Sequence, residues 1–134
     1  MIFLDSNVPM YLVGADHPNK EAVRRILERL VAGRERLVTD AEVIQEILHR
    51  YTAIDRRDAI TPCVDALLGL ADEVAEITPD DALRARDLVC DPALEGLSAR
   101  DAIHVAVMER LGLSRLVSFD RGFDRIPGLE RIDT

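Results

Sequence analysis

Short apolar runs alternate with longer amphipathic stretches along the chain, and this pattern predicts alternating strands and helices. The predicted strands cover residues 2–4, 36–39, 73–77 and 116–119, with a final edge strand at 129–132. The predicted helices cover residues 8–13 (a helix or a turn), 20–32, 41–51, 53–70, 79–89 and 98–111. A strand that is apolar throughout suits a sheet covered on both faces, and parallel strands need crossover connections between them. We therefore predict an α/β sandwich around a mostly parallel sheet.

Several residues mark where the predicted helices begin and end. Residues 39–42 (Thr-Asp-Ala-Glu) have the pattern of a capping box, with either of the first two residues as the cap of the third helix. We expect a chain break at residues 17–19 (His-Pro-Asn), before the second helix. We also expect the fourth helix to break near Thr61 and Pro62 and to stop at Gly69.

The composition indicates one globular domain that spans residues 1–134. Apolar residues make up 48% of the chain and charged residues 31%, which excludes a disordered chain. No apolar run approaches the roughly 18 residues of a membrane span, and no basic segment precedes the N-terminal apolar run as in a secretory signal. Cys63 and Cys90 form neither a disulfide framework nor a CxxC pair. We therefore expect a cytoplasmic protein without membrane association.

The formal net charge of −8 argues against broad electrostatic binding to a nucleic acid. This charge suits an acidic metal site, a basic protein partner or simple solubility equally well. If the protein binds a nucleic acid, local arginines must make the contacts with the phosphates. The candidates are Arg50, Arg56, Arg57, Arg100, Arg121 and Arg125.

Four acidic residues occupy positions that a parallel α/β fold brings toward one edge of its sheet. Asp5 and Asp120 each follow an apolar strand, and Glu46 lies in the second turn of a helix that follows a strand. Open α/β sheets bind ligands at this edge, outside the carboxyl ends of the strands. Asp101 lies in the first turn of an almost wholly apolar helix and can reach the edge through the loop before it. Each position also has a structural alternative, because aspartate caps turns and is favoured by the helix dipole.

Four converging carboxylates repel one another, and a divalent cation relieves that repulsion. Oxygen ligands suit the hard cations Mg²⁺ and Mn²⁺. Such a cation lowers the pKa of a bound water and clamps a phosphate oxygen, so the pattern indicates hydrolysis of a phosphodiester bond. Glu42 lies one helical turn before Glu46, which leaves the ligand set open.

Other chemistries lack their motifs in this chain. There is no GxxxxGK[ST] or GxGxxG loop for a nucleotide and no GxSxG elbow for a serine nucleophile. The histidines lack zinc-site spacing. His104, one turn after Asp101, either reaches the site or is satisfied within the core. A phosphoaspartate mechanism at Asp5 is unsupported because the DxD signature is missing, since residue 7 is Asn.

The whole chain resembles the PIN-domain ribonucleases of the VapC toxin type. The matching segments agree in order and spacing, and they are LDSN at 4–7, VTDAEVIQEI at 38–47, SARDAIHVA at 98–106 and LVSFDRGFDRIPGL at 116–129. The resemblance implies a Rossmann-like three-layer α/β/α sandwich with a mostly parallel central sheet.

The resemblance also implies a role for each acid. Asp5, Asp101 and Asp120 resemble the family's metal-ligand aspartates, and Glu46 resembles its catalytic glutamate. Other polar residues resemble groups that support the acids or their water. These supporting residues are Asn7, Ser118 and Asp124.

A protein of this type is expected to be an Mg²⁺- or Mn²⁺-dependent ribonuclease that acts as a toxin, dimerises and is silenced by a cognate antitoxin. A basic residue of the antitoxin, for which Arg is well suited, would reach the carboxylates. Two alternatives stay open. One is a housekeeping RNA-processing PIN nuclease, and the other is a catalytically silent PIN-like binding module. The short chain, without a further domain, favours the toxin.

Overall fold

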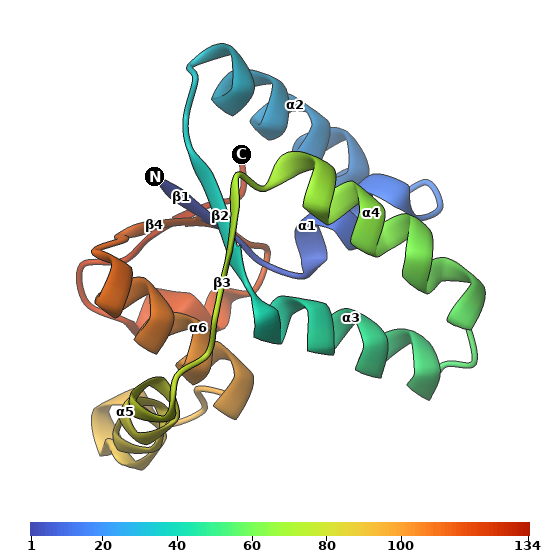
Figure 1. Ribbon diagram of the computed structural model, residues 1–134. Coiled ribbons are helices and arrows are strands. Elements are labelled where there is room, and N and C mark those ends of the chain that lie inside the picture. The colour runs from blue at the N-terminus through green and yellow to red at the C-terminus, as the bar shows by residue number, and fades with distance from the viewer.

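A five-stranded sheet in the order β3-β2-β1-β4-β5 forms the centre of this computed structural model, which describes residues 1–134 (Figure 1). The strands are β1 (Ile2–Leu4), β2 (Leu37–Asp40), β3 (Glu73–Ala75), β4 (Arg115–Val117) and β5 (Glu130–Ile132). The helices are α1 (Asn7–Val13), α2 (Pro18–Ala32), α3 (Ala41–Ala53), α4 (Ile60–Leu70), α5 (Pro79–Cys90) and α6 (Ala99–Leu111). All neighbouring strands are parallel, so the predicted α/β class is confirmed.

Alternate residues of the strands face two separate apolar cores. Phe3 and Val38 belong to the larger core, which is completed by side chains of α3, α4, α5 and α6. Ile2 and Leu4 belong to the smaller core, which is completed by side chains of α1 and α2. All four are fully buried, as expected for strands covered on both faces. In Figure 1, α2 accordingly lies on one side of the sheet and α5 and α6 lie on the other.

The cap of α3 differs from the predicted capping box. Asp40, the last residue of β2, caps the helix, because its carboxylate accepts a hydrogen bond from the backbone N–H of Val43 at 2.9 Å. Thr39 instead donates its hydroxyl to the carbonyl of Leu4 at 2.9 Å and so links β2 to β1. The capping box at residues 39–42 is therefore wrong, although Asp40 was one of the two expected caps.

The predicted helix at 53–70 is divided at a different place. The chain turns at Asp55, whose φ of 56° is left-handed, and α4 begins only at Ile60. Pro62 lies in the first turn of α4, where its missing N–H costs no intrahelical hydrogen bond. Gly69 lies inside the helix, which ends at Leu70. The predicted break at Pro62 is wrong, and the helix ends one residue after the stop predicted at Gly69.

α2 and α5 each begin with a proline. The side chain of His17 accepts a hydrogen bond from the N–H of Asn19 at 3.0 Å, and Pro18 starts α2. The break predicted before the second helix therefore lies at residues 14–17, and α2 begins two residues earlier than expected. Thr78 caps α5 and Pro79 occupies its first turn. None of the helices combines the length and apolar character needed to cross a bilayer.

The strand order creates a switch point between β1 and β4. The chain runs outward from β1 through β2 to β3, and later through β4 to β5 on the other side. The carboxyl ends of β1 and β4 meet there, and the N–H of Asp5 donates to the carbonyl of Val117 at 3.1 Å. α3 starts at the end of β2, and α6 starts at the same edge because it runs opposite to the strand that follows it. This is the position where open α/β sheets bind ligands.

Candidate active site

Asp5 lies directly after β1 at the switch point and is only 3% exposed. Its Oδ1 accepts a hydrogen bond from the backbone N–H of Ser6 at 2.7 Å, and its Oδ2 accepts one from Oγ of Ser118 at 2.6 Å. Burial raises the pKa of Asp5, although the charge of His104 and the bond from Ser118 oppose that effect. A cation at this position would therefore offset the unfavourable buried charge of the Asp5 carboxylate.

Two polar side chains connect Asp5 to the loop after β4. Ser118 is fully buried, and its Oγ accepts a hydrogen bond from the N–H of Asp120 at 3.0 Å while donating to Asp5. Asn7 donates from Nδ2 to Oγ of Ser118 at 3.3 Å and to Oδ2 of Asp5 at 3.4 Å. Two of the expected supporting residues, Asn7 and Ser118, thus contact Asp5 directly.

Asp101 enters the site from the first turn of α6. Ser98 caps this helix, because its Oγ accepts a hydrogen bond from the N–H of Asp101 at 3.1 Å. Burial raises the pKa of Asp101 to about 8, and a hydrogen bond to Asp120 and the charges of Asp5 and Asp120 add to the effect. The Asp101 carboxyl therefore holds a proton near neutral pH when no cation is present.

The chain after Asp120 passes close to these carboxyl groups at Gly122. The N–H of Gly122 donates to Oδ1 of Asp120 at 2.8 Å. A Cβ atom on Gly122 would lie 3.0 Å from that oxygen and 3.4 Å from Oδ2 of Asp101. A side chain at this position would crowd both carboxyl groups, so glycine leaves room for ligands at the site.

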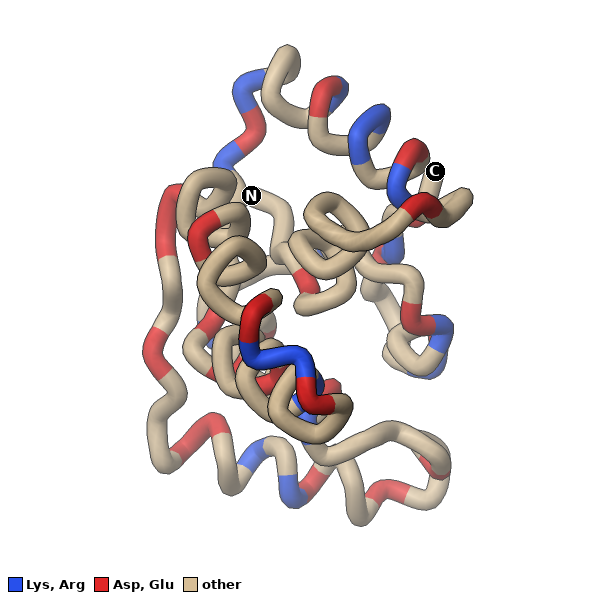
Figure 2. The backbone as a smooth tube through the Cα atoms, turned by 90° about the vertical axis from the view of Figure 1, so that its right-hand side faces the viewer, with Lys and Arg blue, Asp and Glu red and all other residues tan.

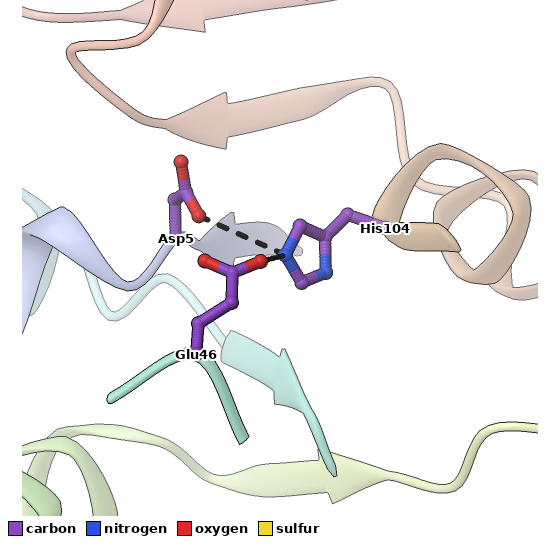
Figure 3. Close-up of side chains that lie close together, drawn as sticks. All are labelled: Asp5, Glu46 and His104. Carbon is purple, nitrogen blue, oxygen red and sulfur yellow. Dashed lines mark hydrogen bonds and ion pairs between the residues drawn. The ribbon is translucent and has the colours of Figure 1, made fainter. Parts of the chain in front are cut away.

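Glu46 projects toward the same place from the second turn of α3. Its Oε2 accepts a hydrogen bond from Oγ of Ser6 at 2.7 Å, and its Oε1 lies 2.6 Å from Nε2 of His104 (Figure 3). Burial opposes the charge of Glu46, but the hydrogen bonds from His104 and Ser6 and the charge of His104 outweigh it and lower the pKa. Glu46 is therefore ionised at neutral pH.

His104 lies at the centre of a buried network. Its side chain has no exposed surface, and its Nδ1 and Nε2 lie 2.7 Å from Oδ2 of Asp40 and 2.6 Å from Oε1 of Glu46. Burial by itself would lower the pKa of His104, but the two hydrogen bonds and the charges of Asp40 and Asp5 raise it well above its ordinary value. His104 is thus an imidazolium that donates to both carboxylates.

From the sequence, Asp40 is expected only as a helix cap, and the role of His104 stays open. The structure gives Asp40 two functions, because one oxygen caps α3 while the other accepts from His104. A signal was present in the sequence. His104 lies on a helix that is apolar almost all round, and a buried ionisable group needs a hydrogen-bonding partner.

Two further acids lie outside the cluster of hydrogen bonds. Asp124, expected as a supporting residue, is paired instead with Arg131 through contacts of 2.9 and 3.2 Å. Glu42 does not line the cleft in front of Asp101, whereas Glu46 does. The structure therefore brings Asp5, Glu46, Asp101 and Asp120 together and engages Asp124 elsewhere.

The donor set suits a divalent cation held by oxygen atoms. Asp5, Glu46 and His104 each bring one ligand atom within 4.8 Å of the others. His104 is nevertheless a poor ligand, because both of its nitrogens are hydrogen-bonded to carboxylates and the ring is protonated. The oxygens of Asp5, Asp101 and Asp120 remain, and burial together with the neighbouring charges of Asp5 and Asp120 raises the pKa of Asp101, which a bound cation would counter.

A cleft of about 440 Å³ opens in front of Asp101 and Asp120 and is bordered by Glu46 and Arg100. Figure 2 shows basic and acidic residues interspersed along the backbone. Of the arginines considered as nucleic-acid contacts, Arg56 and Arg57 are paired with neighbouring aspartates. The candidates without a carboxylate partner are Arg50, Arg100, Arg121 and Arg125.

Comparison with known proteins adds to this geometry. A family model for the PIN domain matches residues 2–129. Ribonuclease VapC13 of Mycobacterium tuberculosis is 56% identical over 132 residues, which cover 98% of this chain and 99% of that protein.

Solved structures share the fold. The crystal structure of Mycobacterium tuberculosis VapC20, a toxin that cleaves the sarcin-ricin loop, has a TM-score of 0.70 at 23% identity and covers 92% of this chain and 93% of that chain. A toxin–antitoxin complex from Klebsiella pneumoniae has a TM-score of 0.66 at 18% identity and covers 96% and 95%. At such identities these structures support the fold alone.

Proposed function

Because the chain belongs to the PIN-domain family and, within it, to the VapC ribonucleases, we propose that it is a metal-dependent endoribonuclease acting as the toxin of a toxin–antitoxin pair. In this proposal residues 1–134 form a single PIN domain that acts in the cytoplasm. The observation that supports it most directly is the convergence of Asp5, Asp101 and Asp120, with Glu46 held beside them.

Asp5, Asp101 and Asp120 would hold Mg²⁺ or Mn²⁺. When bound, the cation supplies a nucleophilic water at neutral pH and neutralises charge on the phosphate. Asp101 gives up its proton on binding, because metal ligands must be deprotonated. Ser118 and the N–H of Ser6 hold the Asp5 carboxylate in one orientation, so that little ordering is needed when the ligands assemble.

Glu46 orients the attacking water in this proposal. His104 and Ser6 each occupy one lone-pair direction of its carboxylate, and the remaining directions can accept a hydrogen bond from water. Because the pKa of Glu46 is lowered, it stays ionised and accepts in this way at neutral pH. Asp40 and His104 are positioning residues, since they hold Glu46 without facing the substrate.

The partner in this proposal is an antitoxin that inserts a basic residue into the acidic cleft, and the protein itself forms a homodimer. An arginine can pair with a carboxylate through two parallel hydrogen bonds. It would compete with the cation for Asp5, Glu46 and Asp101, and the complex should weaken as salt rises. A complex with no basic residue near these acids would contradict this part of the proposal.

The test is cleavage of total RNA by the purified protein with Mg²⁺, with Mn²⁺ and with a chelator, followed by mapping of the new ends. Discrete cut sites that require the cation are expected from the wild type and not from Asp101→Asn. Cutting that persists in the chelator, or in Asp101→Asn, would contradict the proposed site.

Growth separates the toxin from a processing nuclease. Expression of the wild type should arrest growth, Asp101→Asn should not, and co-expression of the neighbouring reading frame should restore growth. Normal growth on expression of a protein that cuts RNA in vitro would favour the housekeeping nuclease.

A further inference from the structure

A second cavity of about 500 Å³ adjoins the acidic cleft and shares Glu46 and Arg100 with it. It lies between α1, α3 and the loop that follows α1. The chain has only two tyrosines and no tryptophan, and both tyrosines, Tyr11 and Tyr51, line this cavity together with His17. Its volume is within the range of about 300–1,000 Å³ that small-ligand sites occupy.

The aromatic wall of the cavity is held in place by its neighbours. The rings of Tyr11 and His17 lie 4.9 Å apart with 31° between their planes. The rings of Tyr11 and Phe119 lie 5.3 Å apart and pack edge to face. The ring of His17 is fixed further, because its Nδ1 accepts from the N–H of Asn19. Fixed aromatic faces beside a cleft are platforms on which unpaired nucleobases stack.

Two arginines also line the cavity, beside the carboxylates of Asp16 and Glu46. Arg50 and Arg100 line it and form no ion pair, although the chain has an excess of acids and most of its other arginines are paired. Guanidinium groups bind phosphate oxygens through paired hydrogen bonds. An aromatic wall and two free arginines next to a phosphodiester-hydrolysing site match the two chemical parts of a nucleotide.

We propose that this cavity is a nucleotide subsite, in which one unpaired base of a single-stranded RNA stacks on Tyr11 and His17 while Arg50 and Arg100 hold the adjoining phosphates. This inference rests on the proposed ribonuclease function and deepens it. The base in the cavity belongs to a residue near the scissile phosphate, because Glu46 and Arg100 line both the cavity and the acidic cleft, and Ser6 of the cavity donates to Glu46. A duplex could not place a base there without unpairing it, so the cut is confined to single-stranded RNA.

The first experiment measures binding of two labelled probes at low salt with a chelator present, so that neither is cut. One probe is a short single-stranded oligoadenylate, and the other is the same ribose-phosphate chain without bases. The wild type should bind the oligoadenylate about 5- to 150-fold more tightly, the range expected for one stacked base. Because both probes carry the same phosphates, repulsion by the acids cancels in the ratio.

Tyr11→Leu keeps an apolar side chain on the smaller core but removes the aromatic face, so the ratio should fall toward one. Tyr11→Phe retains the aromatic face and should keep the wild-type ratio. His17→Asn preserves the cap of α2, because Asn is a good N-cap, and should reduce the ratio. A ratio unchanged in Tyr11→Leu, equal losses for both probes, or no binding of either probe by the wild type would overturn the subsite.

The arginines are tested separately through the salt dependence of binding. Arg50→Gln and Arg100→Gln should weaken both probes alike and each lower the salt slope by about one unit. The matched control is Arg57→Gln, because Arg57 is already paired with Asp55 and should leave the slope unchanged. Equal slopes in all three variants would overturn the phosphate contacts.

A protein ligand is the competing occupant. If Tyr11→Leu weakened binding of the antitoxin but left the ratio of the RNA probes unchanged, the cavity would be a protein site and the subsite would be overturned. Failure of the subsite is distinguishable from failure of the proposed function. A wild type that cuts total RNA but shows no base-dependent binding retains the function, whereas base-dependent binding without cutting contradicts only the function.

Discussion

Two helices of this protein, α5 and α6, have the same local pattern at their N-termini and each buries an aspartate, yet the pKa values of these aspartates shift in opposite directions. Thr78 caps α5 and Asp81 lies three residues later, and Ser98 caps α6 and Asp101 lies three residues later. Asp81 is 3% exposed and Asp101 is 7% exposed.

Their partners make the difference. Asp81 accepts from the N–H of Thr78 and from two nitrogens of Arg110, and although burial opposes its charge these contacts lower its pKa. Asp101 faces Asp5 and Asp120 instead, and its pKa rises to about 8. A buried carboxylate with its own cation is structural, whereas one that lacks a cation is available to bind one.

The largest expected effect comes from removing the protonated ring of His104, which is the positive charge among the buried carboxylates. His104→Leu leaves Asp40 and Glu46 buried without their donor, and it should destabilise the protein by about 3–5 kcal/mol. Chemical denaturation measures this loss.

Two conservative variants show which half of the His104 network serves activity. In His104→Gln the amide can replace Nε2 as the donor to Glu46, and in His104→Asn it can replace Nδ1 as the donor to Asp40. If His104 positions Glu46, the Gln variant should keep more kcat than the Asn variant at similar KM. Equal kcat in both would indicate a purely structural histidine.

The comparison predicts a sharp difference in activity between the two helix aspartates. Asp101→Asn should lower kcat by about 10²–10³-fold or more, because it removes charge where the reaction needs it. Asp81→Asn, the matched control, should leave kcat unchanged in protein that is still folded. RNA cleavage at saturating Mn²⁺ measures both, and similar kcat values in the two variants would contradict the distinction.

Cation binding should stabilise the wild type and not Asp5→Asn. The stabilisation expected is about 2.7 kcal/mol when the cation is present at a hundred times its dissociation constant. Without a cation, Asp5→Asn should be as stable as the wild type or more stable, because it removes a repelling charge. Thermal melts with and without Mn²⁺ test this, and a full metal shift in Asp5→Asn would exclude Asp5 as a ligand.

At α5, unlike at the acidic site, replacing the aspartate should lower the stability of the metal-free protein. Asp81→Asn loses charge-assisted hydrogen bonds to Arg110 and should destabilise the protein by about 1–3 kcal/mol, with or without a cation. Denaturation midpoints of the metal-free proteins compare Asp81→Asn with Asp101→Asn, and Asp101→Asn should lose less stability. A larger loss in Asp101→Asn would mean that its carboxyl group is structural.

The smallest effect is a pH dependence that has opposite signs at the two positions. Asp101 has a folded-state pKa raised to about 8, so metal-free protein binds more protons folded than unfolded and loses stability as pH rises from about 4 to about 8. Asp81 has a lowered pKa, so its contribution is present above about pH 4 and is lost as pH falls. Asp101→Asn should flatten the first trend only, as measured by melting temperature against pH in a chelator.

Much of the fold follows from local pattern. The three-residue apolar run at Ile2–Leu4, the amphipathic α2 and the buried middle of α6 were all predicted, because the pattern of apolar residues reports burial directly. The errors fell at boundaries. Pro62 and Gly69 suggested interruptions, but a proline is tolerated in a first turn and a glycine is tolerated where the helix is held by packing.

The sequence by itself determined which residues carry the charge and at which edge of the sheet they gather. Strand ends and helix starts coincide in a parallel α/β fold, so Asp5, Glu46 and Asp120 could be placed from their distance to the predicted strands. The tertiary structure decided the state of each acid. Asp81 and Asp101 have the same local pattern, and only packing supplies Arg110 to one and two further carboxylates to the other. Protonation depends on charges within a few ångströms, and sequence distance does not give those contacts.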